Sequence, residues 1–294
     1  MSDFKGIYVA SVTPFDSKGN VNYDMVDKLV EKFVNDGLEG IYITGSTGEF
    51  PLLDEDERIN FTDAVCKAAK GKLKVICQIG SESFRRSIRL TEAAAKSGVD
   101  AISSVAPYYF EYSFPEVKKY YKTLANVSDA PMIMYNVPGY TGVSLTVENI
   151  QELAEDPKII GMKHTSYDFM LIERVKALLP NFIVFSGPDE MCLSALSMGI
   201  DGAIGTTYNF QGTLYKKLYD SFKAGDFNTA LKCQNRANAV IHEILDRGVI
   251  QSTKLFLKLQ GYDCGVCREP MKELTDEDTS ILTKVYEDFI APAI

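Results

Sequence analysis

A lysine near the end of an apolar run is the sharpest chemical signal in this sequence. Lys163 lies in "IIGMKHTS", residues 159–166, whose length and flanking helical patterns predict a buried parallel strand. An unpaired ammonium is costly to bury, so a lysine in such a strand tends to give up its proton. The neutral amine can attack a ketone and form a Schiff base, whose iminium draws electrons from the neighbouring carbon. The structural alternative is a lysine that reaches the rim or pairs with Asp189 or Glu190.

Two other segments carry groups that would assist such an amine. Tyr135 lies in the apolar run 131–137, beside Lys163 if the two runs are neighbouring strands. A phenol there can move a proton, although a core tyrosine with a bonded hydroxyl is the commoner case. The turn "GSTGE" could hold a substrate carboxylate with its backbone N–H groups and with the hydroxyls of Ser46 and Thr47. A plain glycine-flanked turn is the alternative.

Two acids follow the run 182–187, where the next helical pattern begins. Asp189 and Glu190 stand where N-terminal capping is common, and we expect one of them to cap this helix. The functional alternative is an acceptor pair for sugar hydroxyls. The only histidines, His164 and His242, are too few for a metal centre, and alternation with Lys163 directs His164 to the opposite face of its strand.

The six cysteines are scattered through helical and strand patterns, which is not a disulfide framework. Cys264 and Cys267 form a C-x-x-C that could be redox-active or half of a zinc site. Because no second cysteine pair or nearby histidine completes a metal site, we interpret the two as reduced thiols in a loop.

The candidate groups need a scaffold that brings the ends of several strands together. Eight apolar runs alternate with helical patterns, at residues 6–12, 40–46, 73–80, 101–107, 131–137, 159–166, 182–187 and 202–207. Strict alternation predicts an α/β protein with a parallel sheet, most simply a closed (β/α)8 TIM barrel. An open doubly wound sheet is the alternative, but the first strand lacks the G-x-G-x-x-G turn of a dinucleotide fold.

The strand signal stops at about residue 227, and three further helical patterns follow it. No linker rich in Pro, Gly or Ser separates them from the barrel. We therefore expect a single domain over residues 1–294, with a barrel at 1–226 and a helical extension at 227–294. Active sites of such barrels lie at the carboxyl ends of the strands, where "TGSTGE", "APYYF", "MYNVP", "KHTS", "SGPDE" and "GTTYN" gather polar and aromatic groups.

Charge and hydropathy exclude several classes of partner. The formal net charge is -9 and the sequence has no cluster of Lys or Arg, so we expect neither nucleic acid nor a membrane surface as a partner. The apolar runs are shorter than the roughly 20 residues of a membrane span. No signal peptide is apparent in "MSDFKGIYVASVTPF", which predicts a cytoplasmic protein. An anionic small substrate is compatible with the charge, because backbone N–H groups can hold a carboxylate.

Three motifs occur in order on successive predicted strands: "GSTGE", "YNVP" and "GMKHTS". Together they resemble the pyruvate-dependent class I aldolases, and the resemblance covers nearly the whole chain, including the three-helix extension. It implies that Lys163 forms a Schiff base with pyruvate and that Tyr135 is the general acid/base. It also implies that Ser46 and Thr47 bind the pyruvate carboxylate, with Thr47 also in the proton relay.

The same resemblance carries an expectation about assembly. Tyr109, in "PYYF", resembles the tyrosine that these enzymes insert into the site of a neighbouring subunit. It therefore implies a homo-oligomer, usually a homotetramer built as a dimer of dimers.

The residues around these motifs favour one branch of the family. The synthase branch carries an arginine shortly after Y-N-x-P, whereas "YNVPGYTG" has Tyr140 and no arginine. "SGPDE" resembles the G-x-D-E of the sialate lyase branch. The residues that this resemblance places against the sugar are Thr165, Gly187, Asp189, Glu190 and Gly205. One departure is Thr206, where lyases usually carry serine, so a methyl group is added beside the substrate.

The resemblance therefore implies a carbon–carbon lyase that reversibly cleaves N-acetylneuraminate to N-acetylmannosamine and pyruvate. It implies no metal and no organic cofactor, since the lysine supplies the electron sink. One alternative is another aldolase or dehydratase of the family that acts on a different 2-keto sugar acid. A catalytically inert sugar-acid-binding protein on the same scaffold is the alternative from another class.

Overall fold

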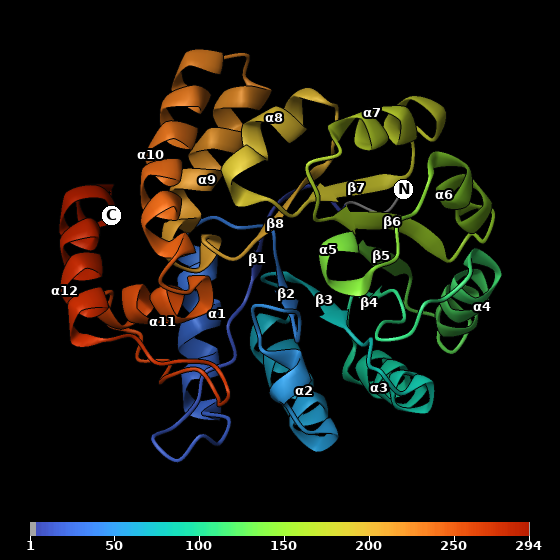
Figure 1. Ribbon diagram of the computed structural model, residues 1–294, viewed down its shortest axis with the longest axis horizontal. Coiled ribbons are helices and arrows are strands. Elements are labelled where there is room, and N and C mark those ends of the chain that lie inside the picture. Colours follow the sequence, from blue (N-terminus) through green and yellow to red (C-terminus); the bar gives the residue numbers. More distant parts are fainter. Residues whose placement is uncertain (1–3, 294) are drawn as a thin grey trace.

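Eight short parallel strands close into a barrel in the computed structural model, which describes residues 4–293 (Figure 1). Residues 1–3 and 294 of the predicted unit lie outside this range. The strands are β1 Gly6–Ala10, β2 Gly40–Ile43, β3 Lys74–Gln78, β4 Ala101–Val105, β5 Met132–Asn136, β6 Ile159–His164, β7 Ile183–Ser186 and β8 Gly202–Gly205. They pair in chain order, and β8 closes on β1 with Ile7 opposite Ala203. The prediction of a (β/α)8 barrel is confirmed.

Helices alternate with the strands and surround the barrel (Figure 1). Those of the barrel are α1 Val26–Asn35, α2 Glu55–Ala69, α3 Phe84–Ser97, α4 Phe114–Ala125, α5 Pro138–Thr141, α6 Val147–Ala154, α7 Phe169–Leu178, α8 Cys192–Ser197 and α9 Tyr208–Lys223. The single turn α5 was not predicted. It begins at Pro138, whose fixed φ suits a first helical turn.

The strands end earlier than the sequence predicts, and β2 shows why. β2 ends at Ile43, whereas the apolar run reaches residue 46. Thr44 has a φ of 50°, a left-handed value that a strand cannot contain. Its hydroxyl donates to the backbone carbonyl of Gln78 at 2.7 Å, which anchors this turn to the next strand. Side chain–backbone bonds of this kind turn the chain at the rim of the barrel.

The strand alternation divides the buried side chains into two layers. Tyr8, Tyr42, Phe185 and their neighbours fill the barrel interior, and the rings of Tyr8 and Phe185 meet edge to face at 5.0 Å. Met134 and Met162 belong to the outer layer between strands and helices. Because side chains alternate along a strand, the residue after Met162 on β6 faces the interior.

Three helices follow the barrel, as predicted: α10 Phe227–Leu245, α11 Val249–Leu259 and α12 Asp276–Val285. They gather on one side of the molecule, beside α9 (Figure 1). They enclose a small core of their own, in which the rings of Phe210 and Phe256 lie 4.8 Å apart. Phe210 belongs to α9, so this core joins the extension to the barrel.

A buried ion pair ties the extension to the turn after β2. The Lys254 amine, on α11, lies 2.7 Å from Glu49 Oε1, and the two side chains are 2% and 0% exposed. Glu49 Oε2 accepts a hydrogen bond from the backbone N–H of Arg268 at 2.8 Å. The Lys254 amine also donates to the carbonyl of Val266 at 3.0 Å. We infer from these contacts that the barrel and the extension form one domain.

Replacing Lys254 by methionine should lower the free energy of unfolding by about 3–5 kcal/mol, because it leaves the Glu49 carboxylate buried without its counter-charge. Lys258 on the same helix is the matched control, since its pair with Asp263 is exposed and Lys258→Met should cost about 1 kcal/mol or less. Urea denaturation of the two variants measures both values. Equal losses for the two variants would contradict a structural role for the buried pair.

Candidate active site

Lys163 lies near the carboxyl end of β6 and is only 6% exposed. Its amine is 4.4 Å from the centre of the Tyr135 ring and 4.7 Å from that of Tyr42. Tyr135 and Lys163 are partners in the register between β5 and β6, so the structure brings them together as predicted. Among residues 4–293, no carboxylate comes within the 4.0 Å of an ion pair with this amine. Pairing with Asp189 or Glu190 therefore does not explain the burial of this lysine.

Tyr42, on β2, is a part of this site that the sequence analysis missed. Its ring meets that of Tyr135 edge to face at 6.0 Å, and its hydroxyl donates to Ser103 Oγ at 3.1 Å. Burial raises the pKa of the Tyr42 phenol well above its usual value, so this group stays neutral. The inward position of an aromatic residue on the second strand was the available signal, but an ordinary core tyrosine gives the same signal.

The "GSTGE" turn follows β2 and contributes hydroxyls to the barrel mouth. Two left-handed residues bracket it, with φ of 50° at Thr44 and 57° at Glu49. Thr47 Oγ1 lies 2.6 Å from Thr206 Oγ1, a hydrogen bond that joins the loops after β2 and β8. Thr47 is buried, and Ser46 is half-buried beside it. The structure thus places both predicted carboxylate-binding hydroxyls at the same end of the barrel as Lys163.

A second group of predicted residues surrounds two unpaired oxygen atoms. Thr165 Oγ1 and Asp189 Oδ1 are buried and have no hydrogen-bond partner among the described residues. A Cβ added at Gly187 would lie 1.9 Å from that threonine oxygen, and one at Gly205 would lie 2.0 Å from that carboxylate oxygen. Only glycine fits at both positions. Buried polar atoms without partners are uncommon, so these two oxygens are candidates for hydrogen bonds to a ligand.

The two acids after β7 make different contacts. Asp189 Oδ2 accepts from the backbone N–H of Thr207 at 2.7 Å and from its hydroxyl at 2.8 Å. Burial raises the pKa of Asp189 to about 6, although both Thr207 hydrogen bonds and the charge of Lys163 act to lower it. Glu190 Oε1 accepts from the Tyr167 hydroxyl at 2.5 Å. No side-chain hydrogen bond caps the helix that begins here, so the capping expectation is wrong, and Asp189 bonds instead to the start of α9.

Tyr109 projects from the loop after β4 and is 88% exposed. It has a φ of 82°, and its ring meets Phe110 edge to face at 5.1 Å. In a single chain it is therefore separate from the buried Lys163 amine, and its predicted entry into a neighbouring subunit stays a prediction. Tyr140, at the position that favoured the lyase branch, is also exposed.

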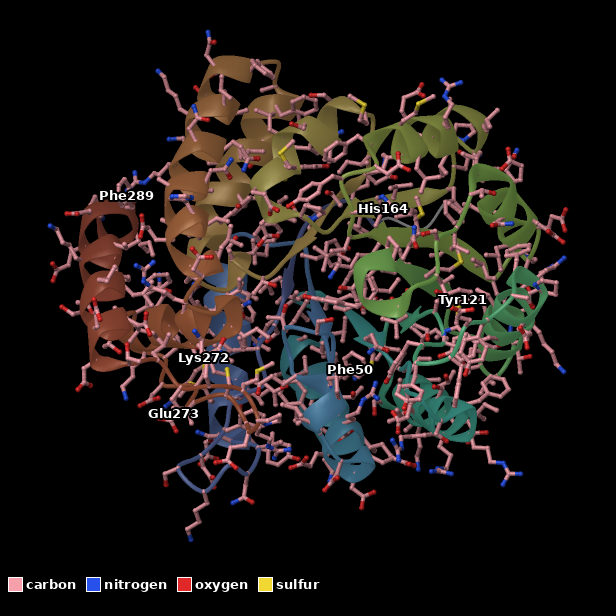
Figure 2. All side chains as sticks on the ribbon, viewed as in Figure 1. Phe50, Tyr121, His164, Lys272, Glu273 and Phe289 are labelled. Atoms are coloured by element: carbon pink, nitrogen blue, oxygen red, sulfur yellow. The ribbon has the colours of Figure 1, made fainter. Side chains whose placement is uncertain are left out.

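The remaining candidate residues lie apart from the barrel interior. His164 ends β6 (labelled in Figure 2), is buried, and pairs its Nδ1 with Asn136 Nδ2 at 3.0 Å. All six cysteines are free and buried, and burial raises the pKa of Cys264 and Cys267 to about 12. Thiols in this state are unreactive, which agrees with their structural interpretation.

Residues 4–293 contain neither a cluster of metal-ligating side chains nor a membrane-spanning helix. No three His, Cys, Asp or Glu side chains in this range group closely enough to hold a metal ion. None of the helices described there is both long and apolar enough to cross a membrane.

A buried amine beside a phenol, with hydroxyls and acids around the mouth of a (β/α)8 barrel, is the arrangement expected of an aldolase that works through a lysine. The chain belongs to the dihydrodipicolinate synthetase family, whose model matches residues 3–288. It is 40% identical over 274 residues to the N-acetylneuraminate lyase of Clostridium perfringens, an alignment that covers 93% of this chain and 95% of that protein.

Two solved structures are similar over nearly their full length. A Clostridium difficile protein in complex with mannosamine has a TM-score of 0.95 and 38% identity, and the match covers 98% of this chain and 100% of that one. The catalytic lysine mutant of the Ruminococcus gnavus sialic acid aldolase has a TM-score of 0.96 and 31% identity, covering 99% and 97% of the two chains. The family relationship therefore extends over both the barrel and the extension.

Proposed function

We propose that this protein reversibly cleaves N-acetylneuraminate to N-acetylmannosamine and pyruvate through a Schiff base on Lys163. The observation that carries the proposal is the buried Lys163 amine, which contacts the rings of Tyr42 and Tyr135 and has no carboxylate partner among the described residues. The N-acetylneuraminate lyase of Clostridium perfringens, at 40% identity, supports the choice of substrate.

In this proposal the reaction begins when the Lys163 amine attacks the C2 ketone of the open-chain sugar acid. Loss of water gives an iminium. Tyr135 gives its proton to the departing water, and the resulting phenolate then takes the proton of the C4 hydroxyl. The bond between C3 and C4 breaks, and its electrons pass to the iminium, which becomes an enamine. N-acetylmannosamine leaves, C3 takes up a proton, and hydrolysis releases pyruvate. The iminium is the electron sink, so the reaction needs neither metal nor organic cofactor.

The other predicted residues hold the substrate at its two ends. Ser46 and Thr47 bind the carboxylate, and Thr47 relays protons to Tyr135. At the other end, the unpaired oxygens of Thr165 and Asp189 bind sugar hydroxyls. The remaining contacts to the sugar come from Gly187, Glu190, Gly205 and Thr206.

We further propose that the enzyme is a cytoplasmic homotetramer. The exposed Tyr109 supports the assembly of subunits, because its ring would enter the site of a neighbouring subunit and join the proton relay there. Its exposure suits that role, because a tyrosine offered to another chain must project from its own.

A second candidate is cleavage of a different 2-keto sugar acid by the same chemistry. Thr206 favours it, since its hydroxyl is engaged by Thr47 at 2.6 Å and its methyl group narrows the space beside the substrate. A coupled assay of pyruvate release over a panel of 2-keto sugar acids separates the two. The proposal requires the highest kcat/KM for N-acetylneuraminate, and a higher value for another acid would favour the second candidate.

Replacing Glu190 by alanine should raise the KM for N-acetylneuraminate about 10–100-fold with little change in kcat, because a hydrogen bond to a charged group is worth about 1.5–3 kcal/mol. Steady-state kinetics measure both constants. Glu173→Ala, which removes an exposed acid from α7, is the control and should leave KM unchanged. An unaltered KM in the Glu190 variant would count against this residue as a contact to the sugar.

Acidification through pH 6 should raise the KM for the sugar acid. Burial raises the pKa of Asp189 to about 6, so the carboxylate becomes protonated as the pH falls through that value and Oδ1 no longer offers a free acceptor. KM measured from pH 5 to pH 8 should show this inflection in the wild type and not in Asp189→Asn. Pyruvate affinity is the internal control, because pyruvate has no sugar tail. The same inflection in the asparagine variant would assign the titration to another group.

A further inference from the structure

The loop after β6 places an exposed tyrosine against the second acid of the β7 loop. The Tyr167 hydroxyl donates to Glu190 Oε1 at 2.5 Å, while the whole tyrosine is 67% exposed. Its backbone is fixed, because the neighbouring Asp168 caps α7 through the N–H of Leu171 at 3.0 Å. The Tyr167 ring therefore has a defined position, and its hydroxyl contacts Glu190.

The backbone of the acid loop is fixed from the opposite side by α10. Asn238 Nδ2 donates to the Glu190 carbonyl and Gln234 Nε2 to the Asp189 carbonyl, both at 3.1 Å. Gln234 Oε1 also accepts from the N–H of Leu193 at 2.9 Å. These bonds hold the main chain and leave the Glu190 side chain to rotate. Within the described residues, the Tyr167 hydroxyl donates the hydrogen bond to this carboxylate, so it selects the rotamer of the Glu190 side chain.

We propose that Tyr167 is a positioning residue that sets the specificity for the substrate tail. Its hydroxyl occupies Oε1 of Glu190, and Oε2, which accepts no hydrogen bond from the described residues, is the oxygen left for a ligand. A carboxylate only accepts hydrogen bonds, so a fixed Oε2 favours 2-keto sugar acids whose tail offers a hydroxyl donor. An acid with an apolar or shorter tail would leave that oxygen unpaired. The inference rests on the proposed function, because it assigns Glu190 to the tail of the substrate.

Tyr167→Phe tests this inference, since it keeps the ring and removes only the hydroxyl. We expect the KM for N-acetylneuraminate to rise about 10-fold, while kcat stays within about twofold of the wild-type value. A change of this size is expected for loss of a hydrogen bond that orients a charged group. The preference for N-acetylneuraminate over a 2-keto acid without the hydroxylated tail should fall by the same factor. Tyr23→Phe, at another partly exposed tyrosine, is the control and should behave as the wild type.

The double variant separates positioning from direct contact with substrate. If Tyr167 acts through Glu190, then Tyr167→Phe should change nothing further in a Glu190→Ala background. An additive effect, or an unchanged KM in Tyr167→Phe alone, would overturn the inference. If the wild type prefers another 2-keto sugar acid, the same comparison is made on that acid. A wild type that cleaves no acid of the panel would refute the proposed function, and the inference with it.

Discussion

Lys163→Ala should reduce pyruvate release from N-acetylneuraminate by about 10⁴-fold or more, with losses of this size known where the nucleophile of a covalent mechanism is removed. Alanine cannot form the iminium, so no electron sink remains for the breaking C3–C4 bond. Substrate binding should survive in part, because the contacts to the sugar come from other loops. A coupled assay at saturating substrate measures the loss.

Lys163→Arg is the informative control for this prediction. Arginine keeps the long side chain, but its guanidinium stays protonated and cannot act as the nucleophile. It should be as inactive as the alanine variant. Matching urea midpoints would show that both variants fold. Near-normal release of pyruvate by either variant would remove Lys163 from the mechanism.

Tyr135→Phe should lower kcat by about 10²–10⁴-fold, the range expected for loss of a general acid/base. Phenylalanine keeps the ring that packs against Lys163 and Tyr42, so the architecture of the site is preserved. Binding of pyruvate should change little, because its carboxylate is held elsewhere. A lower kcat with little change in pyruvate binding would distinguish a role in proton transfer from a purely structural role.

Tyr42→Phe provides the comparison within the same aromatic group. Its hydroxyl bonds to Ser103, and burial raises the pKa of this phenol well above its usual value, so it stays protonated and moves no proton. We expect kcat to fall by less than about 10-fold, as for loss of one neutral hydrogen bond. A loss equal to that of Tyr135→Phe would mean that the two phenols act as one unit.

The barrel could be predicted because alternation along the chain is a local property. Apolar runs and helical periods are each visible within a window of about 11–18 residues, and strict alternation of the two allows few architectures. The ends of the strands could not be placed as well. They depend on contacts such as Thr44 to Gln78, which join different strands and leave no local pattern.

The same distinction between local patterns and long-range contacts applies to the active site. Lys163 and Tyr135 could be placed together, because neighbouring strands in a parallel barrel bring their ends to one edge. The bond between Thr47 and Thr206 joins residues 159 positions apart, and no spacing rule connects them. Asp189 illustrates the same limit. Its position after a strand suggested capping of the next helix, yet its partner is Thr207 on the loop after β8.

The ion pair between Lys254 and Glu49 was equally invisible to sequence analysis. In the sequence, Glu49 is the last residue of the "GSTGE" turn, and Lys254 lies in a helical pattern far along the chain. Their burial at 0% and 2% shows that the extension supports the turn which carries Ser46 and Thr47. Long-range charge pairing of this kind requires the fold before it can be recognised.

Borohydride reduction in the presence of pyruvate tests the central claim most directly. The reagent converts a Schiff base into a stable secondary amine, and mass spectrometry of the digested protein locates the modified residue. We predict one adduct of the mass of reduced pyruvate, on the peptide that contains Lys163, and none in Lys163→Ala. An unmodified Lys163 in the wild type, or an adduct on a different lysine, would contradict the account.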